Sequence, residues 1–221
     1  MEDKFKELVF GVLIYISVPA LLVLIMEAHI CQYTAVPGLN ILLPPWIHYG
    51  SSFMWGNIKG WLLTFPVLML VAHRTRSLLS TVAAILVLWP LFSFISQAVT
   101  GGYNPGSWGF SGYLYAIYGA AIYFTLLGAG QHLQRPAVRV AVVGLISVLA
   151  VIPLLCTPAI LHIGTVTYYI GTRVHLLGFV FGLLMPAVVQ YPDPRSNRIW
   201  VLGVLAVIME WYQFAHIIPY L

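Results

Sequence analysis

Two polar residues in a largely apolar chain, Ser111 and His175, are of the types that nucleophilic catalysis requires. Ser111 lies in the run Gly109-Phe110-Ser111-Gly112 at the start of one apolar segment, and His175 lies near the start of another. A serine hydroxyl becomes a nucleophile when a neighbouring base removes its proton, and histidine is the usual base. An ionisable side chain inside an apolar helix is costly and therefore indicates function. The two residues together predict serine-dependent hydrolysis inside a membrane.

The composition of the chain predicts a lipid environment. Hydrophobic residues make up 61% of the 221 positions and charged residues only 7%, whereas about a quarter of an ordinary soluble domain is charged. The net charge is +4, but the ten basic residues are spread along the chain, so we expect no nucleic-acid partner. Cys31 and Cys156 lack the spacing of a metal site, and we expect neither a metal nor an organic cofactor.

The lengths of the apolar segments predict the number of membrane spans. A bilayer core of about 30 Å requires roughly 20 apolar residues in a helix. On this scale we expect seven spans, at 8–27, 51–72, 77–98, 111–130, 137–157, 172–190 and 198–216. The breaks between them are short and polar, or rich in Gly and Pro. The sequence therefore predicts an all-α polytopic membrane protein.

The basic residues predict the orientation of these spans. Eight of the ten lie at segment ends that share one side of the bilayer, and only Lys59 and Arg173 fall on the other side. Because cytoplasmic loops are rich in Lys and Arg, the N-terminus is expected in the cytoplasm and the C-terminus outside. The expected location is the cell membrane of a prokaryote.

This topology brings three polar residues to one depth. The second, fourth and sixth spans all run from outside to inside, so Asn57, Ser111 and His175 each lie within about two turns of an outer helix end. The stretch 101–109 before Ser111 is rich in chain-turning residues, so the serine is expected where irregular backbone becomes helix. The unpaired amides of a helix start are suited to a developing oxyanion.

Small residues on two spans predict close helix packing. Gly178 and Gly182 lie four residues apart on the sixth span, and Gly112 begins a similar strip on the fourth. Small residues at this spacing let two helix backbones approach closely. Tyr115 lies four residues after Ser111 and therefore on the same helix face, where its ring could pack against an imidazole from another helix.

These residues resemble the rhomboid family of intramembrane serine proteases. The resemblance is carried by the motifs Gly109-x-Ser111-Gly112-x-x-Tyr115 and His175-x-x-Gly178-x-x-x-Gly182. The order of asparagine, serine and histidine in the second, fourth and sixth spans also matches. The resemblance implies a six-helix catalytic core over residues 1–190. Residues 191–221 then resemble the cytoplasmic loop and additional seventh helix of the six-plus-one form, within a single integral domain.

The family pattern implies a role for each of these residues. Ser111 resembles the nucleophile and His175 the general base of a Ser–His dyad that works without an acid. Asn57 resembles the oxyanion donor, acting with the backbone amide of Ser111, and Tyr115 resembles the aromatic residue that stacks on the base. His48 resembles another histidine of the same stretch. The implied substrates are single-pass transmembrane proteins, cleaved near their outer ends.

One departure from the family pattern leaves other readings open. Many members carry a histidine four residues before the asparagine, and this chain has Phe53 there. Phenylalanine donates no hydrogen bond, and losing a donor of this kind can cost about 100-fold or more in rate. A catalytically silent relative that binds transmembrane helices is one alternative. A seven-helix transporter or receptor is another, supported by the span count and by Glu210 in the last span.

Overall fold

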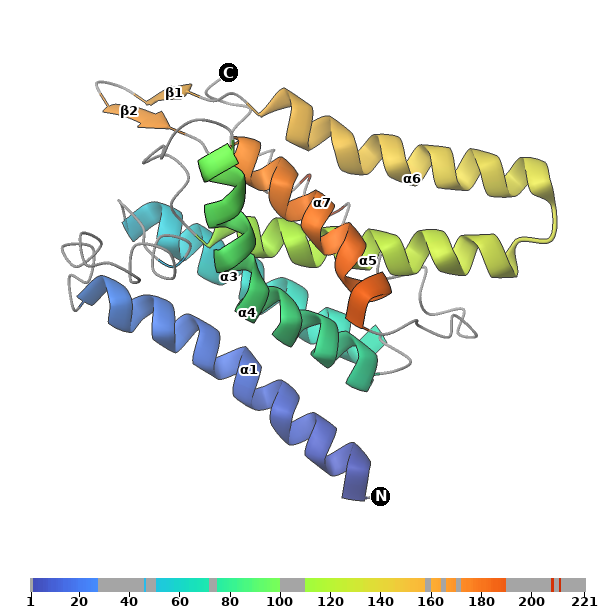
Figure 1. Cartoon of the computed structure of the whole chain (residues 1–221), viewed down its shortest axis with the longest axis horizontal. Helices are drawn as coiled ribbons and strands as arrows, with labels where there is room; N and C mark the ends of the chain where they lie inside the picture. The colour runs from blue at the N-terminus through green and yellow to red at the C-terminus, as the bar shows by residue number, and fades with distance from the viewer. Residues whose placement is uncertain are drawn as a thin grey trace.

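The fold is a bundle of long helices with one small hairpin (Figure 1). The computed structural model describes residues 2–27, 46, 51–71, 75–99, 110–157, 160–163, 166–169, 172–189, 208 and 211. The helices in this part of the chain are α1 (Glu2–Glu27), α3 (Ser51–Val71), α4 (Thr75–Val99), α5 (Ser111–His132), α6 (Pro136–Cys156) and α7 (Thr172–Val189). The strands β1 (Ile160–Ile163) and β2 (Val166–Tyr169) pair antiparallel between α6 and α7.

The helical architecture confirms the coarse prediction from the sequence. Each of the first six predicted spans coincides with one helix, although α1 starts at Glu2 rather than at residue 8. The hairpin corrects the all-α prediction, because the sequence predicted only an external break between α6 and α7. The predicted seventh span, 198–216, lies outside the described residues except for Ile208 and Trp211, which are both helical.

Among the described residues, two helices are long and apolar enough to cross a membrane, Lys4–Glu27 within α1 and Pro136–Cys156, which is α6. They lie at opposite edges of the bundle in Figure 1. Both expose large apolar side chains along their outer faces, including Leu13 and Leu24 on α1 and Val140 on α6. An apolar helix face of this length is typical of contact with lipid.

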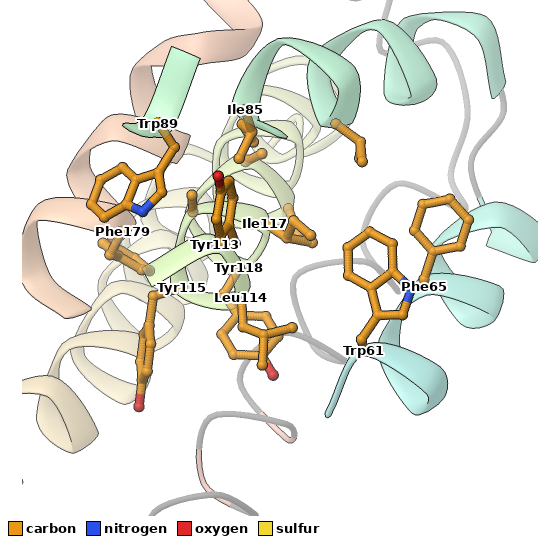
Figure 2. Packing of buried hydrophobic residues seen from close by; sticks show 14 of the residues in the cluster. Trp61, Phe65, Ile85, Trp89, Tyr113, Leu114, Tyr115, Ile117, Tyr118 and Phe179 are labelled. Atoms are coloured by element: carbon orange, nitrogen blue, oxygen red, sulfur yellow. The ribbon is translucent and has the colours of Figure 1, made fainter. Parts of the chain in front are cut away.

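The core of the bundle is built around α5. This helix packs most extensively against α7, and it also contacts α3, α4 and α6. Every described residue from Gly112 to Ile122 is buried. Large aromatic side chains fill the core, and Figure 2 shows Trp61, Phe65, Trp89 and Tyr113 among them, with Trp89 also in contact with Phe181 of α7. The start of α5, where Ser111 lies, is therefore enclosed by protein on several sides.

Candidate active site

The side chains of Ser111 and His175 meet. His175 Nε2 lies 2.8 Å from Ser111 Oγ, although the two residues are 64 positions apart in the chain. Ser111 is the first residue of α5, and His175 is the fourth residue of α7. The separation of these two atoms is that of a good hydrogen bond. With the hydroxyl donating to Nε2, the pair has the arrangement in which an imidazole can take the serine proton.

The pair lies in a partly enclosed position. His175 is only 9% exposed, and Ser111 is partly buried. When Nε2 of a neutral imidazole accepts a hydrogen bond, the ring proton is on Nδ1. Among the described residues, no group is hydrogen-bonded to His175 Nδ1. No carboxylate of the described residues therefore orients the imidazole.

The aromatic ring of Tyr115 orients the imidazole instead. The two rings stack with centroids 4.4 Å apart and planes inclined by 19°. Tyr115 is itself buried, and Tyr118 packs against it edge to face at 5.6 Å. Because stacking restricts the ring plane, this contact limits rotation of the His175 side chain. The structure contains the predicted contact between the Tyr115 ring and the His175 imidazole.

Glycine residues bring α5 and α7 into backbone contact. A Cβ atom on Gly178 would overlap the carbonyl group of Gly112, and a Cβ atom on Gly182 would overlap that of Ala116. A Cβ atom on Gly119 would overlap the backbone of α7 in the same way. The two helices therefore run side by side from the same end. This approach lets the short serine side chain reach the histidine, as the glycine spacing predicted.

The first turn of α5 is well defined. The carbonyl of Phe110 accepts hydrogen bonds from the amides of Tyr113, at 3.0 Å, and Leu114, at 3.3 Å. The helix thus begins at Ser111, and the amides of Ser111 and Gly112 have no acceptor within the helix. Such amides, at the positive end of a helix, can stabilise an oxyanion formed beside Ser111.

Asn57 lies in the second turn of α3 and is partly buried. Trp61, one turn further along the helix, contacts Phe110 edge to face with ring centroids 5.7 Å apart. This contact places the middle of α3 beside the residue that precedes Ser111. The oxyanion role of Asn57 stays a prediction. Phe53 belongs to the first turn of α3.

Three of the residues singled out in the sequence, Gly109, His48 and Glu210, lie outside the described residues. No group of three or more His, Cys, Asp or Glu side chains that could hold a metal ion occurs in the described part of the chain. Cys156, at the end of α6, is a free and exposed thiol.

Several aromatic residues around Ser111 were not predicted from the sequence. The ring of Trp46 packs against Phe110 at 5.4 Å and against Tyr113 at 4.9 Å. The indole of Trp89 covers Gly112, where an added Cβ atom would lie 2.6 Å from the ring. The position of Phe110 next to the serine was the only available signal. Aromatic residues are so common in this chain that their type alone does not mark them.

Comparisons of this chain with protein-family models, with curated proteins and with solved structures find no match. The resemblance to the rhomboid family accordingly rests on the sequence motifs alone.

Proposed function

We propose that this chain is an intramembrane serine endopeptidase of the rhomboid type. The observation that carries the proposal is the 2.8 Å contact between Ser111 Oγ and His175 Nε2, made by two separate helices. The exposed apolar faces of α1 and α6 support a setting in the bilayer. Lipid is then the surrounding partner, and the N-terminus is cytoplasmic in the orientation that the basic residues predict.

The mechanism follows from the donor and acceptor atoms. His175 Nε2 takes the hydroxyl proton while Ser111 Oγ attacks a peptide carbonyl and forms a tetrahedral oxyanion. Amides at the start of α5 and the side chain of Asn57 stabilise the negative oxygen. The imidazolium then gives its proton to the leaving amine, and the acyl-enzyme is hydrolysed by water with His175 again as the base. Tyr115 keeps the imidazole in plane throughout.

The proposed substrates are single-pass transmembrane proteins. Ser111 lies at the first residue of a helix and His175 in the first turn of another, which supports a reaction near a helix end, where water can reach it. A substrate helix hides its carbonyls in internal hydrogen bonds, so it must unwind before attack. Segments with Gly or Pro near the outer end of the substrate helix are therefore preferred.

The proposed architecture is six helices plus one. Trp211 supports a seventh helix that packs on the bundle, because its indole Nε1 donates to the carbonyl of Leu149 in α6 at 2.9 Å. In this arrangement residues 1–190 form the catalytic core, and residues 191–221 form a loop and the added helix.

Co-expression with a tagged single-pass membrane protein tests the proposal. Wild-type protein should release a fragment of the size expected for a cut near the outer end of the substrate helix. Ser111→Ala and His175→Ala, expressed to the same level, should release none. Cleavage that persists in both variants would refute the proposed mechanism.

Phe53 favours a second candidate function, a helix-binding relative without catalytic activity. A phenylalanine in the first turn of α3 supplies no hydrogen bond to an oxyanion. The same co-expression separates the two proposals. A substrate that co-purifies intact with the wild-type protein, and equally with Ser111→Ala, would favour the silent binder.

A further inference from the structure

Prolines inside the helices leave backbone carbonyls without their usual partner. In an α-helix, the amide at each position donates to the carbonyl four residues earlier, and proline has no amide hydrogen. The described helices contain five interior prolines, Pro19, Pro66, Pro90, Pro153 and Pro186. In a membrane, water cannot satisfy the freed carbonyls, so another donor is needed.

The pair α1 and α3 satisfies two of these carbonyls reciprocally. Pro19 frees the carbonyl of Tyr15, and Trp61 Nε1 donates to that oxygen at 3.2 Å. Pro66 frees the carbonyl of Leu62, and the hydroxyl of Tyr15 donates to that oxygen at 3.4 Å. Tyr15 thus makes two bonds with α3, because its hydroxyl donates to the Leu62 carbonyl and its own carbonyl accepts from Trp61.

Helix α5 uses the same arrangement with α4. Pro90 frees the carbonyl of Leu86, and the hydroxyl of Tyr113 donates to that oxygen at 3.3 Å. Figure 2 shows Tyr113 reaching from α5 toward the helix that carries Ile85. Tyr113 is fully buried and lies two residues after Ser111, in the same helical turn.

Helix α6 shows the arrangement a fourth time. Pro153 frees the carbonyl of Leu149, which accepts the bond from Trp211 Nε1 at 2.9 Å. The carbonyl of Pro153 itself accepts both the amide of Thr157, at 3.1 Å, and its hydroxyl, at 2.6 Å. The backbone on both sides of this proline is therefore hydrogen-bonded.

Four bonds between different parts of the chain thus end at carbonyls that a proline frees, although the helices that accept them contain 21 to 26 residues each. We propose that Tyr113 is a positioning residue for Ser111, held by the carbonyl that Pro90 frees on α4, and that Tyr15, Trp61 and Trp211 hold their helices by the same means. The bond to Leu86 fixes the first turn of α5, and the serine reaches His175 from that turn. The part of this inference that concerns Ser111 rests on the proposed function, whereas the hydrogen bonds themselves do not.

A double-mutant cycle tests the pairing of donor and proline. Tyr113→Phe keeps the ring and removes the donor, while Pro90→Ala supplies an amide to the Leu86 carbonyl within α4. In detergent, Tyr113→Phe should lower the unfolding temperature by about 2–4 °C, the size expected for one hydrogen bond in a chain of this length. In the Pro90→Ala background the same substitution should lower it by less, because the carbonyl is already satisfied and only the bond of the hydroxyl to Trp46 is lost.

A matched control and a reactivity measurement complete the experiment. Tyr118→Phe makes the same change on the same helix and should have equal effects in the two backgrounds. The rate at which a fluorophosphonate probe labels Ser111 should fall about tenfold in Tyr113→Phe. This rate should stay low in the Tyr113→Phe Pro90→Ala double variant, although Tyr113→Phe lowers the unfolding temperature less in that background. A purely structural tyrosine would lose its effect on labelling together with its effect on stability.

The outcomes separate the two levels of the inference. Equal destabilisation by Tyr113→Phe in both backgrounds would overturn the pairing with Pro90, and unchanged labelling by Tyr113→Phe would overturn the positioning role. Wild-type protein that is folded and never labels, with the cycle as expected, would refute the proposed function and leave the pairing intact.

Discussion

Helices α7 and α6 both lie beside α5, but they are held there in different ways. Helix α7 presents Gly178 and Gly182 to α5, so that the two backbones touch. Helix α6 contacts α5 much less and exposes apolar side chains such as Val140 and Leu155. Its bond to Trp211 and the capping contacts of Thr157 fix it at one end.

The difference teaches where the bundle needs a fixed distance. The Ser–His separation depends on α5 and α7, and a contact between backbones has no side chain that could adjust. Helix α6 contacts α5 and α7 far less than these two helices contact each other, and residues 157–171, which include the hairpin, join it to α7. We therefore expect a displacement of α6 to change the Ser–His distance less than a displacement of α7 would.

Gly182→Ala should break the tight contact and give the largest effect. The added Cβ would overlap the Ala116 carbonyl, so α7 must move away and carry His175 with it. We expect cleavage to fall at least about 100-fold, because a displacement of about 1 Å has this effect on catalysis. The assay is substrate cleavage at matched folded protein.

Gly144→Ala on α6 is the matched control for that substitution. Apart from the neighbouring backbone of α6, no atom of the described residues lies within 4 Å of the Cβ position at Gly144, and alanine favours a helix over glycine by about 1 kcal/mol. Cleavage should be unchanged, and the free energy of unfolding unchanged or raised. Equal losses in both variants would show that the two contacts do not differ.

Substitution of Tyr115 tests which contact between α5 and α7 orients the His175 imidazole. Tyr115→Leu removes the ring that stacks on His175, and aromatic stacking of this kind contributes about 0.5–1.5 kcal/mol. Probe labelling of Ser111 should slow by about three- to tenfold, while Tyr115→Phe should stay close to wild type. A large loss in Tyr115→Phe would mean that the hydroxyl, and not the ring, is what the site requires.

Trp211→Phe should affect only the packing of α6 and should therefore change the labelling of Ser111 least. Loss of the indole donor leaves the Leu149 carbonyl unsatisfied, so the unfolding temperature should fall by about 2–4 °C. In the Pro153→Ala background the same change should have little effect. Labelling of Ser111 should stay within about twofold of wild type, since α6 does not set the Ser–His distance. A tenfold loss of labelling would contradict the independence of α6.

Much of the fold could be predicted from the sequence because apolar length and helix formation are tied together in a bilayer. The meeting of Ser111 and His175 followed from two further signals, a shared depth near one helix end and the spacing of Gly178 and Gly182. Both signals can be read from residue positions alone, because depth follows from the distance to a helix end and the glycine spacing follows the helical repeat.

The hairpin and the aromatic contacts could not be predicted in the same way. The segments Ile160–Ile163 and Val166–Tyr169 are rich in β-branched and aromatic residues, which is a strand signal, but they are too short to stand out beside the spans. The bonds to carbonyls freed by proline depend on how each helix is rotated about its axis. The prolines are visible in the sequence, whereas the donor that reaches each carbonyl is not.

The identity of the reactive side chain is the most direct test of the account. Purified protein in detergent is treated with a fluorophosphonate probe, and mass spectrometry then locates the modified residue. The account predicts labelling at Ser111 that is absent in Ser111→Ala and reduced at least about 100-fold in folded His175→Ala, because general-base catalysis contributes a factor of this size or more. Labelling of Ser111 that is equally fast in His175→Ala, or folded wild-type protein that is never labelled, would contradict it.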